Sequence, residues 1–467
     1  MPGSRAASFL ALPMAALLTG CSVTDTISDT VSSAFDSAYN STLGNASTLG
    51  SAPRATAEPD TGLAVGDEPF AVKTGTAILA EGGNAADAVT AMFFAMTATY
   101  PVAAGLGGGG ICLVSDPARG IREFDFLPRA AKTGGAYAVP GAVRGFYDLQ
   151  NAFGMLPWQR DVAGGEAFAA TGFPISHALA ARLANTLTLV RQDPALASEF
   201  LDGTGRVKAE GTVVANTSLS QTLSAIRLSG ADGFYEGAVA DQIVRGAAAQ
   251  GGAISPQDLL DYRTGVTAPR MVAEGGYSVA IPDAATGAGA FAQSLLANAA
   301  RGGQPESEVV AAVRRSLASF GISALPADLG GTGFAAVDRN GQAAVCGVTM
   351  NGPFGAGRTA AASGVLLASA PALPAGIAGA FLTPVIARDA DGKVAMAGVG
   401  AGGPNGTAAI AYVLLRLAAG QSIDRPGDLR STGAAPAVTV NVISCGSVCV
   451  ALPDPGGHGL GAGEAVP

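Results

Sequence analysis

The sequence predicts a layered protein in which helices pack against β-sheets, and two stretches support this prediction. Residues 331–351 contain two apolar runs separated by DRNG at 338–341, a string of turn-forming residues, and therefore predict a β-hairpin. GGNAADA at 82–88 leads into an alanine- and phenylalanine-rich segment that ends near Thr99 and suits a buried helix, and Pro101 stops it. With 467 residues the chain is long enough for one large layered domain or for two or three domains of average size.

The composition favours tight turns and small-residue packing over a charged surface. Charged residues make up 13% of the chain and 66 residues are glycine, whereas soluble proteins average about 25% charged residues and about 7% glycine. The net charge of −9 and the lack of basic clusters argue against a nucleic-acid partner. His177 and His458 are the only histidines and no ligand cluster accompanies them, so we expect no metal ion. The glycine run at 105–110 lacks the Gly-Lys-Ser/Thr ending of a phosphate-binding loop, so we expect no nucleotide and no other cofactor.

The N-terminus resembles a bacterial lipoprotein signal. Arg5 precedes an apolar run at 6–18 that is too short to span a bilayer, and the following LTGC is similar to a lipobox. We therefore predict a signal peptide at 1–20 and a lipidated Cys21 that anchors the protein to a membrane surface. The lipidated residue begins a flexible tether at 21–65, rich in small polar residues. We therefore expect the protein to lie in the bacterial cell envelope, facing the periplasm. The sequence does not distinguish the inner membrane from the outer membrane.

The other four cysteines fall into two pairs with different surroundings. Cys112 and Cys346 lie in apolar runs and are interpreted as buried small hydrophobic residues. Cys445 and Cys449 are separated by three residues, and an envelope address permits a disulfide between them. Whether that second pair is bonded is left open by the sequence.

The hairpin and the residues after it follow a known pattern without a gap. Asp338, Gly341, Thr349, Asn351 and FGAG at 354–357 occupy matching positions of T-[TSA]-H-[YFL]-S-V-V-D-x-x-G-N-A-V-(x)4-T-x-N, followed by F-G-[ST]-G. This pattern opens the small subunit of γ-glutamyltranspeptidases, an N-terminal-nucleophile hydrolase family that the chain therefore resembles. Further family-like strings precede the hairpin in the family's order: GGNAADA at 82–88, GLGGGG at 105–110, VPGAVRG at 139–145, LPW at 156–158, GFP at 172–174, FYEG at 234–237, GG at 251–252, DL at 258–259 and YR at 262–263.

The resemblance implies an α+β fold, the four-layer αββα sandwich of N-terminal-nucleophile hydrolases. It divides the chain after the tether into a large-subunit-like part at 66–330 and a small-subunit-like part at 331–420. Residues 421–467 diverge from the family. Within them we expect the proline- and glycine-rich residues 450–467 to be poorly ordered.

The resemblance places the family's catalytic threonine at position 331, where this chain has glycine. In the family, self-cleavage frees that threonine, its hydroxyl attacks the γ-glutamyl carbonyl, and its own α-amine acts as the base. Gly331 has no oxygen nucleophile. Thr332 follows it, but neighbouring side chains on a strand point to opposite faces. We therefore expect Thr332 to face away from the nucleophile position, unless the strand slips by one residue or bulges.

Other site positions match the family in part. The resemblance assigns a supporting role to Thr349, a substrate contact to Asn351, and the oxyanion hole to the backbone of Gly402 and Gly403. The substrate clamp departs from the family. Leu127 stands where the family's D-F-R-E string has a carboxylate-binding arginine, and Arg129 reaches the site only if the intervening proline redirects the chain. The strings ASAPAL at 368–373 and AF at 380–381 replace the family's Asn-Asn-[EQ]-x-x-Asp and Ser-Ser strings.

Three functions are compatible with this pattern, so whether the chain is an enzyme is left open. It is a lipoprotein of the γ-glutamyltransferase (glutathione hydrolase) family that has become impaired, a pseudoenzyme or periplasmic binding protein. Alternatively, it is an active amidohydrolase that uses Thr332 on a different acyl amide. Otherwise it is an ordinary glutathione hydrolase whose motifs are misaligned. Each hypothesis implies a small-molecule γ-glutamyl or acyl-amide ligand, and the oligomeric state is not predicted.

Overall fold

The structure is a computed structural model, and it describes residues 62–286, 288–299, 305–360, 362–371, 375–429 and 438–464. All of these residues belong to one compact unit at 49–467. The predicted signal peptide, the lipidated Cys21 and the tether as far as residue 61 lie outside the described residues. Within the described ranges, no helix combines the length and the apolar character needed to cross a bilayer.

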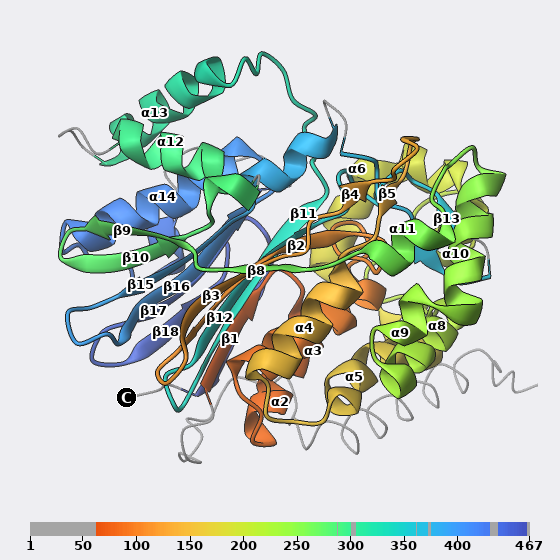
Figure 1. Cartoon of the computed structure of the whole chain (residues 1–467), viewed down its shortest axis with the longest axis horizontal. Helices are drawn as coiled ribbons and strands as arrows, with labels where there is room; N and C mark the ends of the chain where they lie inside the picture. The colour runs from red at the N-terminus through yellow and green to blue at the C-terminus, as the bar shows by residue number, and fades with distance from the viewer. Residues whose placement is uncertain are drawn as a thin grey trace, which may run out of the picture. The chain divides into compact units, whose positions relative to one another are not determined.

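Two antiparallel sheets form the centre of the fold (Figure 1). The strands of the seven-stranded sheet, in the spatial order β19-β1-β11-β12-β2-β3-β8, are Leu460–Glu464, Gly62–Gly66, Gly331–Asp338, Ala343–Thr349, Gly109–Asp116, Gly120–Asp125 and Gly265–Thr267. The strands of the six-stranded sheet, in the order β18-β17-β16-β15-β10-β9, are Cys449–Leu452, Thr439–Cys445, Val394–Ala401, Thr383–Arg388, Tyr277–Ile281 and Arg270–Glu274. Short two-stranded pairs join β4 (Arg129–Ala130) to β5 (Ala138–Val139), β6 (Phe173–Pro174) to β7 (Val213–Val214) and β13 (Thr359–Ala360) to β14 (Val365–Leu366).

Helices cover the outer faces of both sheets, so the predicted four-layer αββα sandwich is confirmed (Figure 1). The α-helices are α2 Pro69–Ala80, α3 Ala85–Thr99, α4 Ala142–Phe153, α5 Trp158–Thr171, α6 His177–Gln192, α7 Pro194–Phe200, α8 Thr217–Ser229, α9 Asp232–Tyr235, α10 Gly237–Ala249, α11 Pro256–Asp261, α12 Gly289–Ala299, α13 Pro305–Ser319 and α14 Pro404–Ala418. The 3-10 helices are η1 Ala284–Thr286, η2 Ala375–Phe381 and η3 Pro426–Leu429. Helices α3 and α4 lie on the seven-stranded sheet, whereas α14 lies on the six-stranded sheet and supports α12 and α13.

An apolar core fills the space between the sheets. Val65 of β1, Val337 of β11 and Val345 of β12 meet Val399 of β16 and Ile443 of β17 there, and all five are buried. Burial of such side chains is the main favourable term in folding. The alternation of apolar residues along these strands therefore fixes which face of each strand looks at the other sheet.

Both elements that the sequence predicts from pattern are confirmed. Strands β11 and β12 pair without interruption, from Gly331 opposite Thr349 to Val337 opposite Ala343. Helix α3 is buried along its whole length. It begins at a capping box in which the Asn84 side chain and the Asp87 side chain each accept the other residue's backbone N–H.

The boundary predicted for the tether is wrong at its end. Gly62–Gly66 is strand β1, which lies between β19 and β11 in the seven-stranded sheet. Leu63 and Val65 enter the core between the sheets. A short strand that follows a small-residue segment is easily mistaken for more linker, and the predicted boundary at residue 66 assigns all but the last residue of this strand to the tether.

The structure also differs from the prediction of poor order at the C-terminal end. Strand β18 pairs with β17, and β19 pairs with β1 along its whole length. The glycines that suggested disorder are required here by close approach, because a Cβ on Gly463 would lie 2.1 Å from the carbonyl oxygen of Gly62. Strand β19 therefore covers what would otherwise be an open edge at β1.

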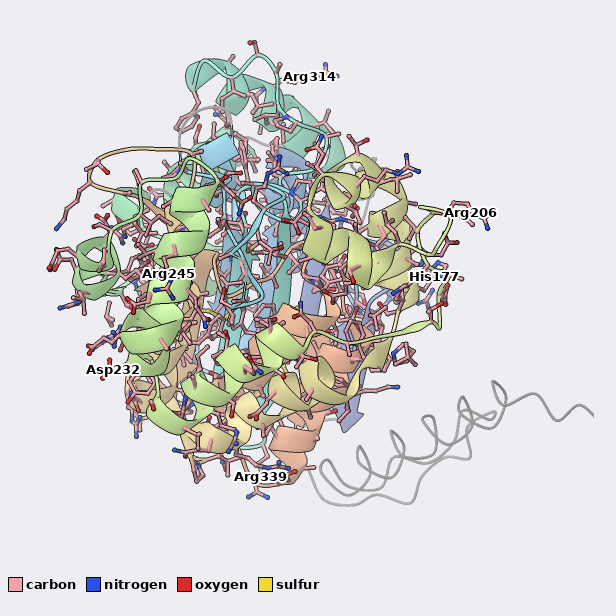
Figure 2. The ribbon with its side chains drawn as sticks, turned by 90° about the vertical axis from the view of Figure 1, so that its right-hand side faces the viewer. His177, Arg206, Asp232, Arg245, Arg314 and Arg339 are labelled. Carbon is pink, nitrogen blue, oxygen red and sulfur yellow. A yellow bond between two sulfur atoms is a disulfide. The ribbon has the colours of Figure 1, made fainter. Side chains whose placement is uncertain are left out.

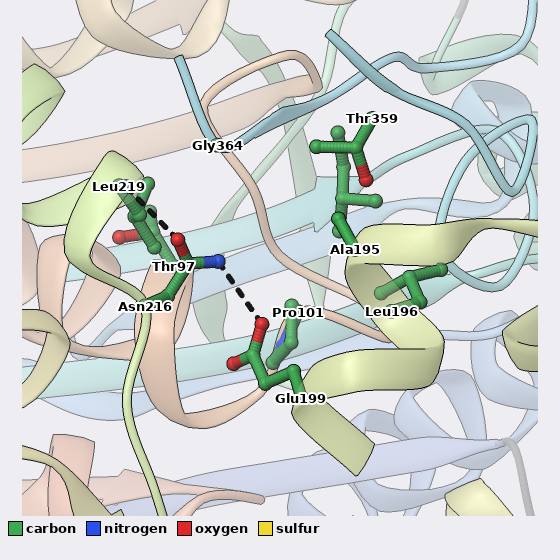
Figure 3. A pocket seen from close by; sticks show the side chains of 10 residues that line it. Thr97, Pro101, Ala195, Leu196, Glu199, Asn216, Leu219, Thr359 and Gly364 are labelled. Carbon is green, nitrogen blue, oxygen red and sulfur yellow. Dashed lines mark hydrogen bonds between the residues drawn. The ribbon is translucent and has the colours of Figure 1, made fainter. Parts of the chain in front are cut away.

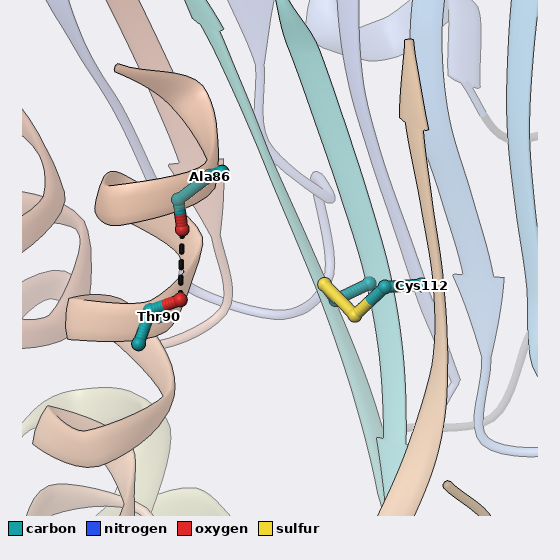
Figure 4. The surroundings of a disulfide bond; sticks show 4 residues. Ala86, Thr90 and Cys112 are labelled. Atoms are coloured by element: carbon teal, nitrogen blue, oxygen red, sulfur yellow. Dashed lines mark hydrogen bonds between the residues drawn. A yellow bond between two sulfur atoms is a disulfide. The ribbon is translucent and has the colours of Figure 1, made fainter. Parts of the chain in front are cut away.

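Cys112 and Cys346 are buried as predicted, but they also form a disulfide, which the sequence did not indicate (Figure 4). They are directly opposite each other on β2 and β12, with Cα atoms 4.2 Å apart, and both are fully buried. This bond joins the large-subunit-like part of the chain to the small-subunit-like part. Cys445 and Cys449, whose pairing the sequence leaves open, also form a disulfide.

The cross-strand disulfide predicts that the two subunit-like parts stay joined after a cut between them. A site-specific protease sequence inserted between Pro326 and Ala327, which are exposed, allows the full chain to be cut there. We expect one band on a non-reducing gel and two bands after reduction, because the bond at Cys112 crosses the cut. The double variant Cys112→Ala, Cys346→Ala is the control and separates without reductant. Separation of the cut wild-type chain under denaturing, non-reducing conditions would contradict the pairing.

The four arginines labelled in Figure 2 lie on separate elements. Arg206 follows α7, Arg245 belongs to α10, Arg314 belongs to α13 and Arg339 lies in the turn between β11 and β12. These four side chains therefore do not form one basic patch.

Candidate active site

Gly331 begins β11 and is buried, at the position where the resemblance places the nucleophile. A Cβ at this residue would lie 3.4 Å from the backbone N of Gly402, 3.3 Å from the carbonyl oxygen of Val348 and 3.7 Å from Cδ2 of Leu382. A side chain at position 331 would therefore point toward the turn that contains Gly402 and Gly403, the residues predicted to form the oxyanion hole. Glycine places no side-chain atom in that space, so a hydroxyl nucleophile is missing there.

Thr332 has different surroundings. Its hydroxyl donates a hydrogen bond of 2.6 Å to Oδ2 of Asp67, and both residues are buried. The other carboxylate oxygen of Asp67 accepts hydrogen bonds from Thr439 and Asn441 on β17. The pairing of β11 with β12 runs without a shift through Gly331 and Thr332. Neither a slip nor a bulge brings the Thr332 hydroxyl to the position of residue 331.

Gly402 and Gly403 form the turn between β16 and α14. Their φ angles of 82° and 127° lie in the region that residues with a Cβ rarely adopt. Gly403 is the N-cap residue of α14 and has no side chain that could cap the first N–H groups of the helix. The turn therefore leaves backbone N–H groups at the positive end of a 15-residue helix, where negative charge on an oxygen is stabilised.

Thr349 and Met350 hold the peptide bond that precedes residue 331. The Thr349 hydroxyl is 3.2 Å from the carbonyl oxygen of Gly330 and 3.3 Å from that of Leu329. The backbone N–H of Met350 donates to the same Gly330 oxygen at 3.0 Å. The Thr349 hydroxyl in turn accepts the N–H of Asn351 at 2.9 Å. The carbonyl before Gly331 is thus polarised by hydrogen-bond donors.

Asn351 has one satisfied and one unsatisfied side-chain atom. Its φ of 54° is unusual for a residue with a side chain. Its Nδ2 donates to the carbonyl oxygen of Ser369 at 3.0 Å. Its Oδ1 is buried and has no hydrogen-bond partner among the described residues. A buried acceptor without a donor is costly, and a ligand N–H would satisfy it.

The residues at the family's carboxylate clamp make apolar or unrelated contacts. Leu127 packs with Leu382 and Ala401 in a small hydrophobic cluster. Arg129 is half exposed, pairs with Asp125 at 3.1 Å, and lies over the ring of Tyr262 at 5.8 Å. The guanidinium of Arg129 is thus already engaged by a carboxylate and an aromatic ring.

The structure contains a polar cluster beside β11 that we did not predict from the sequence. Arg182 binds both carboxylate oxygens of Asp328 at 2.8 and 3.0 Å, and Asp328 accepts the N–H of Gly330 at 2.7 Å. Glu68, next to Asp67, accepts from the Ser176 hydroxyl at 2.7 Å. The one available signal is the acidic pair DE at 67–68 within the apolar string GLAVGDEPF. The side chains that bind this pair are more than 100 residues away in sequence.

Two solved structures share the fold of this chain. The cephalosporin acylase from Bacillus halodurans superposes with a TM-score of 0.71 over 89% of this chain and 99% of its own, at 17% identity. The γ-glutamyltranspeptidase from Helicobacter pylori superposes with a TM-score of 0.51 over 57% of this chain and 85% of its own, at 23% identity. With the strand order above, these similarities show the N-terminal-nucleophile hydrolase fold.

A family model described as Gamma-glutamyltranspeptidase matches residues 71–307, just over half of the chain. The chain therefore belongs to the γ-glutamyltranspeptidase family. A glutathione hydrolase proenzyme of Pseudomonas aeruginosa is 31% identical over 54% of this chain and 48% of its own. Glutathione hydrolase 3 of Arabidopsis thaliana is 29% identical over 48% of this chain and 37% of its own. The chain thus spans less than half the length of these curated relatives, and the family match ends before Gly331.

Burial of Glu68 predicts a pH-dependent stability. Burial, which hydrogen bonds from Ser176 and Phe70 only partly offset, raises the pKa of Glu68 to about 8 from 4.5. The stabilisation by the neutral carboxyl is therefore complete below about pH 4.5 and is lost as the pH rises toward 8, at about 1.4 kcal/mol per pH unit. Glu68→Gln removes this slope. Urea unfolding at pH 5, 6, 7 and 8 measures it, with the exposed Glu236→Gln as control. Parallel pH profiles for wild type and Glu68→Gln would contradict the assignment.

Proposed function

We propose that this chain is an uncleaved and catalytically inactive member of its family, which is anchored in the bacterial cell envelope and binds a small amide without hydrolysing it. The observation that supports this most directly is the glycine at position 331, which faces Gly402 in a site whose other backbone features are present. The family's covalent chemistry requires a hydroxyl at that position. Without it, neither an ester intermediate nor hydroxyl attack on the carbonyl of Gly330 is available.

The contacts of Thr332 do not favour the alternative of a shifted nucleophile. A threonine nucleophile needs access to the substrate carbonyl and a base that takes its proton. Thr332 is fully buried, and its hydroxyl donates to the carboxylate of Asp67, which also accepts hydrogen bonds from two residues of the opposite sheet. These contacts support a structural role.

The polar atoms that remain support a neutral amide as the ligand. The N–H of Gly402 suits a carbonyl oxygen, and the unsatisfied Oδ1 of Asn351 suits an N–H. Leu127 has no charged group that could bind the carboxylate of a ligand. A charge-assisted hydrogen bond contributes about 1.5–3 kcal/mol, so we expect a γ-glutamyl group, with its two charges, to bind worse than an uncharged acyl amide.

Two features support the envelope location. The lipobox-like LTGC ends at Cys21, and two disulfides lie within the described residues. Disulfides form and persist in oxidising compartments such as the periplasm.

The absence of a nucleophile predicts a single chain with no turnover. We expect the reduced full chain to keep one mass after incubation at neutral pH, and to hydrolyse neither glutathione nor an uncharged acyl anilide. Gly331→Thr supplies the missing hydroxyl beside the polarised carbonyl of Gly330, so this variant is expected to give two fragments. Gly331→Ala is the matched control, because it adds the same Cβ without the hydroxyl, and it stays intact. Cleavage of the wild type before residue 331 or 332, or turnover of either amide, would overturn the proposal.

A second prediction separates the structural role of Thr332 from a catalytic one. Thr332→Val keeps the shape but leaves a buried Asp67 oxygen without this donor, so the free energy of unfolding is expected to fall by about 1–3 kcal/mol. Thr332→Ser keeps a hydroxyl and is expected to retain most of that stability. Urea unfolding measures both variants. An unchanged stability of Thr332→Val, together with loss of a wild-type hydrolytic activity, would instead identify Thr332 as the nucleophile.

A further inference from the structure

The pocket drawn in Figure 3 is too small to bind a ligand other than water. In it, Nδ2 of Asn216 donates to Oε2 of Glu199 at 3.0 Å. About 20 Å³ of the pocket is open to the centre of a water molecule, and one water needs about 10–15 Å³ on this measure. A larger partner can therefore bind only elsewhere, and one side of the sandwich offers an open surface for it.

The two sides of the sandwich differ in how their end strands are covered. On one side, β18 and β19 are in contact, since a Cβ on Gly461 would lie 2.8 Å from the carbonyl oxygen of Ala451. On the other side, the sheets end in β8 and β9, which follow each other in the chain (Figure 1). No other described strand pairs with the outer edge of either. This side therefore presents unpaired backbone groups.

Apolar side chains are exposed along the same stretch of chain. Val266 of β8 is 51% exposed, and Met271 of β9 is 40% exposed. Leu260, on α11 just before these strands, is 40% exposed. Strand β8 has three residues, so it is poorly suited to pairing. Strand β9 is the five-residue string RMVAE at 270–274, and it has no proline, bulge or central charge of the kind that protects edge strands.

The register of the β9–β10 hairpin shows which backbone groups of β9 point outward. Its turn at 275–276 has positive φ angles of 55° and 89°, as in a type I′ turn. In such a turn the flanking residues, Glu274 and Tyr277, form a hydrogen-bonded pair. Because these pairs alternate with non-hydrogen-bonded pairs along antiparallel strands, the N–H and C=O groups of Met271 and Ala273 point away from β10.

The sequence of β9 is complementary to itself in the antiparallel direction. A pair of β9 strands centred on Val272 places Arg270 of each copy opposite Glu274 of the other. Opposite charges directly across a pair of strands are favourable. No described residue engages either charged group in an ion pair or hydrogen bond. In the same register Met271 lies opposite Ala273 of the second copy, so the outward backbone groups of both residues form hydrogen bonds.

We propose that β9 docks a second copy of this chain, so that the six-stranded sheets of two molecules join edge to edge in a symmetric dimer. Each copy offers the same strand, as a two-fold axis requires. The edge is already ordered, because Val272 packs against the apolar cluster that contains Val279 and Leu414. Docking onto an ordered strand does not require a loop to fold first.

The charges at the two ends of β9 test the dimer. Sedimentation equilibrium is done on the full-length protein, with Cys21→Ser in every variant so that no lipid is attached there. We expect a reversible dimer. Glu274→Arg makes both charge pairs repulsive and is expected to raise the dimer dissociation constant about tenfold or more. The double variant Arg270→Glu, Glu274→Arg restores both pairs and is expected to dimerise as wild type does. Glu236→Arg, an equal charge change at another exposed site, is the control.

Engineered cysteines in the same background test the register. Val272 of one copy and Val272 of the other form a non-hydrogen-bonded pair with Cα atoms about 4.5 Å apart, a separation that a disulfide can bridge. Val272→Cys is therefore expected to give a reducible covalent dimer under mild oxidation. Arg270→Cys and Glu274→Cys are each expected to remain uncross-linked alone and to cross-link when mixed. Ser278→Cys, exposed on β10, is the control and is expected to remain uncross-linked.

Three outcomes would overturn the proposal. The first is a monomeric mass of the wild-type chain at every concentration. The second is a dimer that Glu274→Arg does not weaken. The third is a dimer in which Val272→Cys forms no cross-link, because two copies would then meet through another surface. The mass of the wild-type chain can be measured whether or not any variant folds. None of these results bears on the nucleophile at position 331, so the test is independent of the proposed function.

Discussion

The buried carboxylate of Asp67 is the interaction on which the surroundings of the candidate site depend. Asp67 directly follows β1 of the seven-stranded sheet and accepts a hydrogen bond from the Thr332 hydroxyl on β11. It also accepts hydrogen bonds from Thr439 and Asn441 on β17 of the other sheet. A buried acceptor of this kind is stable only while its donors stay in place. Asp67 therefore fixes how the two sheets meet beside residue 331. It also engages the hydroxyl of Thr332, the residue considered above as a substitute nucleophile, in a hydrogen bond.

The two subunit-like parts of the chain form one interleaved structure. The seven-stranded sheet places β11 and β12 from the second part between β1 and β2 from the first, and the six-stranded sheet ends with β10 and β9 from the first part. The Cys112–Cys346 disulfide links the parts across β2 and β12. The Arg182–Asp328 ion pair holds the segment just before β11. All of these contacts are present with residue 330 still joined to residue 331.

The sequence predicts most of the architecture but little of the site's connectivity. The hairpin at 331–349 and the helix at 85–99 are marked by apolar runs and turn or cap residues that lie close together in the chain. Strands β1 and β19 are short and rich in small residues, so local pattern does not distinguish them from linkers. The Cys112–Cys346 bond and the Thr332–Asp67 hydrogen bond join residues 234 and 265 positions apart. Such contacts depend on the register of strands that meet only in the folded protein.

The proposed inactivity follows from the absence of a nucleophile at Gly331, and a trapping experiment can detect any nucleophile that the chain supplies elsewhere. The full-length protein is incubated with a large excess of a γ-glutamyl anilide, and separately of an uncharged acyl anilide, then denatured in acid and analysed by mass spectrometry. We expect the unmodified mass of the chain at every time point with both amides. An acyl adduct on the chain, above all one that maps to a peptide containing Thr332, would contradict it.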